Sequence, residues 1–105
     1  MHNHQQLAAH IDKLNRDIAH KTHARNEWMA RRQTALGHLQ HCSNADSMNL
    51  EGTQRLRDDK TMWQNKLNIA NNHLQDYDEF IRRDRNSLND AQRQLNSLGR
   101  PHQRH

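Results

Sequence analysis

The chain has 105 residues, of which 31% are hydrophobic and only 4% aromatic, with 16 Lys and Arg residues against 12 Asp and Glu residues. A chain this short and this polar forms one domain at most and cannot bury a large globular core. The formal net charge of +4 is too small to require a polyanionic partner.

Cysteine content and the distribution of apolar residues indicate in which cellular compartment the protein is expected. Cys42 is the only cysteine, so an internal disulfide is impossible and nothing points to an oxidising compartment. The first residues, MHNHQQ, form no apolar leader, and no apolar run approaches the length that spans a bilayer. We therefore expect a cytoplasmic protein without a membrane partner.

The first predicted helix covers about residues 3–40. Steps of four and three residues through it give a stripe, the first seam, whose ends are apolar and whose middle contains basic residues. Its members are Leu7, Ile11, Leu14, Ile18, Lys21, Arg25, Trp28, Arg32, Ala35 and Leu39. Gly37 is unfavourable in a helix interior and can mark an early end.

Residues 41–49 form the predicted turn, because their Ser, Asn and Asp side chains compete for backbone hydrogen bonds. The second predicted helix covers about residues 50–98 and has its own 4-3 stripe, the second seam. Its members are Leu56, Lys60, Trp63, Leu67, Ala70, Leu74, Tyr77, Ile81, Asp84, Leu88, Ala91, Leu95 and Leu98. Gly99 and Pro101 form a stop pattern, which leaves 1–99 as one domain and 100–105 as a flexible tail.

A short turn makes two such helices antiparallel, so the predicted fold is all-α, a long antiparallel two-helix coiled-coil hairpin. The two seams mesh when the two tryptophans face each other. This register pairs Trp28 with Trp63, Ala35 with Leu56, Ile18 with Leu74, Leu14 with Tyr77 and Ile11 with Ile81. It leaves Lys21 facing Ala70. Asp84 then faces Leu7.

A sparser apolar stripe lies beside the seams, and a two-helix hairpin cannot cover it. We therefore predict a homodimer that forms a four-helix bundle, or a hairpin completed by the helices of another protein. An isolated monomer is the alternative. The outer apolar residues predicted to contact the partner are Met29, Leu36, Met62, Ile69, Phe80, Leu95 and Leu98, the last two lying beyond the reach of the first helix.

The sequence contains no phosphate-binding loop, no HExxH and no nucleophile elbow. A two-helix hairpin is also expected to offer no concave, water-excluding pocket of the kind that chemistry needs. The predicted function is therefore non-enzymatic and needs no cofactor. We expect a protein-interaction module of the adaptor, chaperone or inhibitor type.

Nucleic-acid binding is the alternative function, because the whole net charge of +4 lies between Arg82 and the C-terminus, in the last part of the second helix and the tail. The basic residues that would contact phosphates are Arg82, Arg83, Arg85, Arg93 and Arg100. Interleaved carboxylates and the lack of an aromatic stacking platform weaken this interpretation, since a solvated charged face explains the same residues.

Histidine is unusually frequent, with ten in the chain. His38, His41 and Cys42 follow the i, i+3, i+4 spacing that places two imidazoles and a thiolate on one helical face, as Zn²⁺ sites require. They border the predicted turn, where solvated polar residues are the commoner explanation. No metal site is therefore predicted, and these three residues are weak candidates only.

Overall fold

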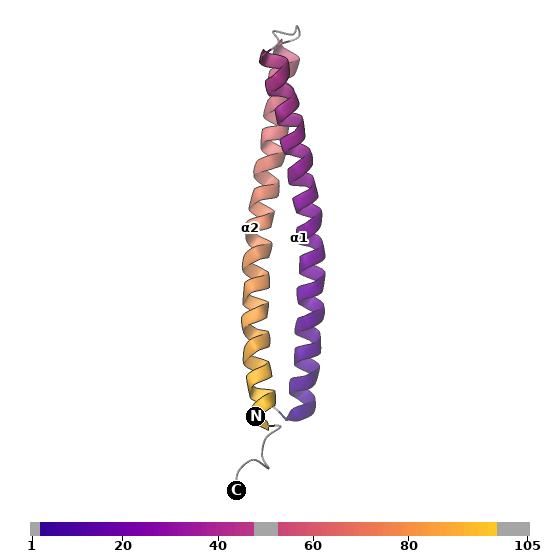
Figure 1. The fold of residues 1–105 in the computed structure, drawn as a ribbon, viewed down its shortest axis with the longest axis vertical. Coiled ribbons are helices and arrows are strands. Elements are labelled where there is room, and N and C mark those ends of the chain that lie inside the picture. The colour runs from indigo at the N-terminus through magenta and orange to yellow at the C-terminus, as the bar shows by residue number, and fades with distance from the viewer. Residues whose placement is uncertain (1–2, 48–52, 99–105) are drawn as a thin grey trace. The chain divides into compact units, whose positions relative to one another are not determined.

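The computed structural model describes residues 3–47 and 53–98. It contains two α-helices, α1 at His4–Ser47 and α2 at Thr53–Leu98 (Figure 1). The two helices pack against each other as a hairpin, which confirms the predicted all-α hairpin. Over the residues described, neither helix holds a stretch apolar enough to cross a bilayer.

The start of α1 is fixed by a reciprocal cap. The Gln6 backbone N–H donates to Asn3 Oδ1 at 2.8 Å, and the Asn3 backbone N–H donates to Gln6 Oε1 at 3.2 Å. This pair satisfies two backbone donors that the first helical turn would leave unbonded. The predicted start near Asn3 is therefore confirmed.

The predicted end of the first helix is wrong, because α1 continues through residues 41–47. Cys42 and Ala45 are buried in this stretch, and the Gln40 side chain donates to the Asn44 side chain at 3.3 Å. Burial of one face thus outweighs the turn preference of the neighbouring polar residues. Gly37 lies inside α1. Residues 48 and 49 of the predicted turn and the predicted tail at 100–105 fall outside the described residues.

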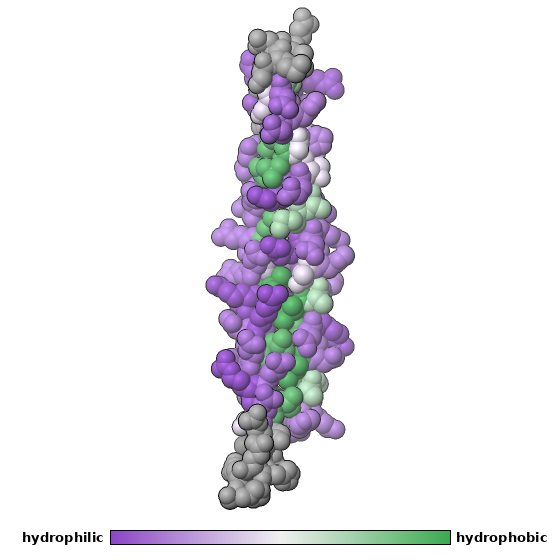
Figure 2. All heavy atoms as spheres, in the orientation of Figure 1, coloured by the Kyte–Doolittle hydropathy of each residue, from purple (hydrophilic) through white to green (hydrophobic). Residues whose placement is uncertain are grey.

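Both seams are confirmed as buried stripes. Every member of the first seam is buried or half-buried, and so is every member of the second seam except Leu98. On α1 the buried residues Leu7, Leu14, Ala35 and Cys42 follow a spacing of seven or its multiples, as coiled-coil packing requires. On the face drawn in Figure 2, apolar side chains show between polar ones.

The chain divides into two units, and each contains a segment of both helices. The first unit comprises Met1–His23 with Tyr77–His105, and the second comprises Ala24–Asp76. In the first unit Lys21 bonds to Asp84, while Leu7 and Ala91 line one small hollow, so the segments run antiparallel. The single domain predicted for 1–99 stays a prediction.

The second unit is also antiparallel, but its register differs from the predicted one. Trp28 of α1 stacks on His73 of α2, ten positions beyond its predicted partner Trp63. Trp63 instead stacks on His38. Likewise, Arg32 Nε donates to Asn71 Oδ1 at 2.9 Å. The predicted pairing of the two tryptophans is therefore wrong.

The misplaced turn explains the register error. The midpoint between the end of α1 and the start of α2 lies five residues later than the midpoint of the predicted turn. In an antiparallel hairpin, such a displacement moves each facing residue by ten positions. Ten positions are close to three seam steps of 3.5 residues. Both seams therefore stay buried, although each residue of one seam faces a different residue of the other.

The first unit departs from the predicted pairs as well. Lys21 bonds to Asp84, so the predicted pairing of Asp84 with Leu7 is wrong, as is that of Lys21 with Ala70. Leu95, which the predicted register left beyond the first helix, is half-buried.

Candidate functional site

The outer apolar residues divide into two groups by exposure. Four on α2 are strongly exposed: Met62 at 43%, Ile69 at 49%, Phe80 at 41% and Leu98 at 43%. The other three, Met29, Leu36 and Leu95, are half-buried. In the second unit, Met62 and Ile69 lie seven residues apart on α2 and so share one side of that helix. In the first unit, Phe80 meets Tyr77 edge to face at 6.3 Å between ring centroids.

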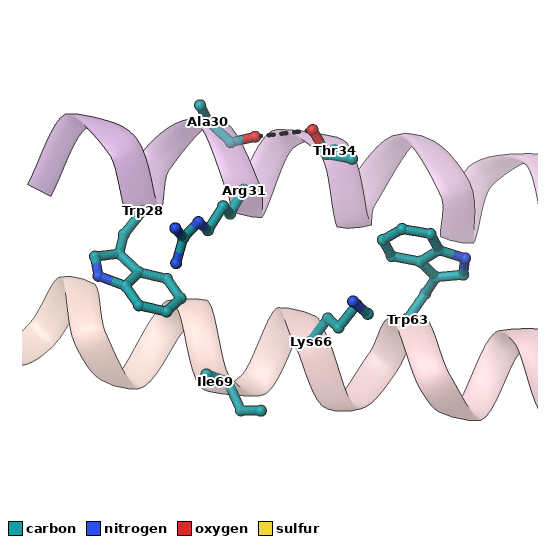
Figure 3. A pocket seen from close by; sticks show the side chains of 7 residues that line it. All are labelled: Trp28, Ala30, Arg31, Thr34, Trp63, Lys66 and Ile69. Atoms are coloured by element: carbon teal, nitrogen blue, oxygen red, sulfur yellow. Dashed lines mark hydrogen bonds between the residues drawn. The ribbon is translucent and has the colours of Figure 1, made fainter. Parts of the chain in front are cut away.

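A hollow in the second unit is lined by aromatic, apolar and basic side chains from both helices. Its volume is about 540 Å³. The lining of this tryptophan hollow consists of Trp28, Ala30, Arg31 and Thr34 from α1 and Trp63, Lys66 and Ile69 from α2. Figure 3 shows the two indoles at opposite ends, with Arg31 and Lys66 between them. The hollow is open to solvent, since Ala30, Arg31 and Lys66 of its lining are exposed, so the prediction that the hairpin offers no water-excluding pocket for chemistry stays a prediction.

Trp28 is held between two planar groups. The imidazole of His73 stacks on the indole with a centroid distance of 3.9 Å and an interplanar angle of 13°. The guanidinium carbon of Arg31 lies 4.3 Å from the centroid of the same indole. Two groups this close to one centroid cannot share a face, so His73 and Arg31 cover opposite faces of Trp28. This arrangement combines stacking across the helices with a cation–π contact along α1.

Trp63 repeats these contacts from the other helix. Its indole stacks on the imidazole of His38, with a centroid distance of 3.8 Å and an interplanar angle of 3°. The ammonium nitrogen of Lys66 lies 5.3 Å from the same centroid. Each helix therefore contributes a tryptophan with a cation over its ring, and each of these tryptophans stacks on a histidine of the opposite helix.

The similar contacts of the two tryptophans correspond to a repeat in the sequence. Trp28, Arg31, Ala35 and His38 recur 35 residues later as Trp63, Lys66, Ala70 and His73. Among the residues that the structure describes, Ala35 and Ala70 are the least exposed of the buried apolar ones, at 0% and 1%, and small side chains there permit close approach of the helices. Thirty-five residues are five heptads, so the repeat keeps both copies in seam phase. Comparing the surroundings of the two tryptophans would have revealed it.

The chemistry available in the tryptophan hollow is that of binding. Thr34 Oγ1 donates to the Ala30 carbonyl oxygen at 3.1 Å, so this hydroxyl is engaged within α1 (Figure 3). Arg31 and Lys66 are exposed cations, and the remaining lining is aromatic or apolar. Such a lining favours an apolar molecule that carries negative charge.

The predicted nucleic-acid surface is partly neutralised by its own helix. Arg83 Nη2 lies 2.6 Å from Glu79 Oε1, and Arg93 Nη1 lies 3.7 Å from Asp90 Oδ1. The other two described arginines of this group, Arg82 and Arg85, are exposed. Arg100 lies outside the described residues.

The weak metal candidates are not brought together as a ligand set. The His38 ring lies flat on Trp63, Cys42 is buried, and His41 is exposed. Across residues 3–47 and 53–98, no group of three or more histidine, cysteine or acidic side chains is arranged to hold a metal ion.

The chain matches no protein-family model, no curated protein and no solved structure.

Proposed function

We propose that this hairpin is a non-enzymatic protein-interaction module whose exposed apolar side chains are covered by helices of a partner. The observation that carries the proposal is the exposure of four large apolar side chains on α2, although every other member of the two seams is buried or half-buried. These residues are Met62, Ile69, Phe80 and Leu98, all more than 40% exposed. Exposed apolar residues that recur on one helix are typical of surfaces that bind other helices.

Covering these residues would contribute favourable free energy to association. Complete burial of a large apolar side chain contributes about 1.5–3 kcal/mol, and slightly less than half of each side chain remains to be buried. Each residue therefore offers roughly 1 kcal/mol. A second copy of the chain provides the same apolar side chains, so a homodimeric four-helix bundle is the simplest form of the proposal. Adaptor, chaperone and inhibitor roles use the same surface with another protein.

Nucleic-acid binding has less support. The exposed pair Arg82 and Arg85 favours it, but the carboxylates beside Arg83 and Arg93 oppose phosphate contacts. It remains the second candidate. A gel shift at low salt tests it, with Arg82, Arg83 and Arg85 changed together to Glu as the comparison. Retardation of the wild-type chain that this variant loses would establish it.

The test of the interaction proposal is Phe80→Asp, with Asn72→Asp as the matched control. Both changes add one negative charge to α2, but Phe80 belongs to the outer apolar residues, whereas Asn72 is an exposed polar residue. We expect Phe80→Asp to lower the mass measured by light scattering or to abolish capture of a partner, with helicity retained. The proposal fails if Phe80→Asp and Asn72→Asp leave mass and capture equally unchanged.

A further inference from the structure

We propose that the tryptophan hollow of the second unit binds a flat aromatic anion. The site is independent of the interaction proposal, apart from Ile69, which belongs both to the hollow and to the outer apolar residues. Phe80, the residue that tests the interaction proposal, lies in the other unit.

The shape of the hollow favours a flat ligand. Trp28 and Trp63 stand at its two ends, and Ile69 and Ala30 supply apolar surface between them (Figure 3). Its volume of about 540 Å³ lies within the range of sites for small molecules. A ring system placed along the hollow would contact the edge of the Trp28 indole, whose faces are covered by His73 and Arg31, together with aliphatic groups. Aromatic rings gain about 0.5–1.5 kcal/mol from such contacts beyond the area that they bury.

The charge of the hollow favours an anion. Arg31 and Lys66 line it, and the set of lining residues that the structure describes includes no carboxylate. The two cations come from opposite helices at equivalent positions of the repeat, so the positive charge belongs to the hollow as a whole. A neutral ring system would make no charge-assisted contact with either cation.

Arg31 is positioned to bind an acidic group in addition to supplying charge. Its guanidinium carbon lies over the Trp28 ring, and Trp28 is fixed from its other face by His73 of α2. A guanidinium that rests on an aromatic face still presents N–H donors at its edge, which suit a carboxylate or a sulfonate. Because the stacked side chain has already lost part of its rotational freedom, less entropy is lost when the anion binds.

The probe is 8-anilinonaphthalene-1-sulfonate, titrated into the full chain. The two tryptophans of the sequence both line the hollow, so binding there should quench tryptophan emission while the probe becomes fluorescent. We expect one saturable site per chain. The matched neutral probe, N-phenyl-1-naphthylamine, lacks the sulfonate and should bind about tenfold more weakly, because it makes no charge-assisted contact.

Two variants separate this site from non-specific binding. Arg31→Gln combined with Lys66→Gln should weaken the anionic probe about tenfold or more and leave the neutral probe unaffected. The control, Arg82→Gln combined with Arg85→Gln, removes the same charge from the other unit and should leave binding unchanged. Thr34→Phe keeps the charge but fills the hollow, so it should abolish binding of both probes. Circular dichroism verifies that each variant remains helical.

Three results would overturn the proposal. The first is the absence of a saturable site on the wild-type chain. The second is an equal loss of affinity in the two double Gln variants, which would indicate a response to net charge alone. The third is unchanged binding by a helical Thr34→Phe variant, which would place the probe elsewhere.

Discussion

Lys21 Nζ lies 2.6 Å from Asp84 Oδ2. Within the first unit, Lys21 is the charged residue of the first seam and Asp84 is the charged residue of the second seam, and the two bond to each other. Both side chains are partly buried, with exposures of 32% and 18%. A charge in a packed seam is costly unless an opposite charge satisfies it. The pair therefore favours the observed register over any register that separates its members.

Replacing one member of this pair should destabilise the hairpin more than replacing both. Lys21→Leu leaves a partly buried carboxylate without its cation, and we expect a loss of about 1–2 kcal/mol in the free energy of unfolding. Adding Asp84→Leu should recover most of that loss, because two apolar side chains then fill the seam. Urea denaturation of the two single variants and the double variant measures the coupling.

The exposed pair of Arg83 and Glu79 provides the control for that cycle. Its side chains are 66% and 43% exposed, so the coupling should be only about 0.3–0.5 kcal/mol. Additive effects of Lys21→Leu and Asp84→Leu would contradict the observed register, since the predicted register keeps these two residues apart.

Tryptophan fluorescence tests the stacking in the second unit. In a Trp63→Phe background only Trp28 emits, and His73→Ala removes the imidazole that covers one of its faces. We expect emission at longer wavelength, stronger quenching by acrylamide and a loss of about 1 kcal/mol of stability. His38→Ala in the same background should leave the emission of Trp28 unchanged, because His38 stacks on the other tryptophan.

The reciprocal background provides the second half of that test. With Trp28→Phe, the emission of Trp63 should respond to His38→Ala and ignore His73→Ala. A response of either tryptophan to the wrong histidine would refute the ten-position correction of the register.

Gly37→Ala should stabilise α1. Gly37 lies in the helix interior, and a Cβ added there meets nothing within 4 Å. Alanine restricts the unfolded chain more than glycine does, so we expect a gain of about 0.5–1 kcal/mol. Thermal unfolding followed by circular dichroism measures it. A lower midpoint for Gly37→Ala would contradict the placement of this residue inside a helix.

Enlarging the central alanines should have the opposite effect. Ala35 is 0% exposed and Ala70 is 1% exposed. Leucine at either position must push the helices apart or adopt a strained rotamer, at a cost of about 1–3 kcal/mol. Ala9→Leu is the control, because Ala9 is exposed on α1 and has room for the larger side chain. Equal urea midpoints for Ala35→Leu and Ala9→Leu would count against this packing.

The seams were predictable because burial of a helix depends on periodicity, and periodicity can be read along one chain. Leu7, Leu14 and Ile81 are buried where their spacing placed them. The end of α1 was harder to predict from the sequence. Polar residues near Cys42 have turn preferences of a fraction of a kcal/mol each, whereas the packing of Cys42 and Ala45 depends on a facing helix that local preference does not describe.

The tryptophan hollow escaped prediction for a related reason. The spacing places Trp28 and Trp63 in the seams, and both are half-buried there. The histidines that stack on them, His73 and His38, face them only in the observed register. The 35-residue repeat was visible in the sequence, whereas its meaning depends on which residues face each other.

The sequence by itself determined that two helices form and which stripe of each is buried, because each stripe follows from the repeat of its own helix. Only the tertiary structure decided which residue of one seam faces which residue of the other. Sliding one seam along the other by three steps preserves all of its apolar periodicity, so the choice rests on individual contacts. Lys21 with Asp84 and the two tryptophan–histidine stacks are contacts that form in the observed register.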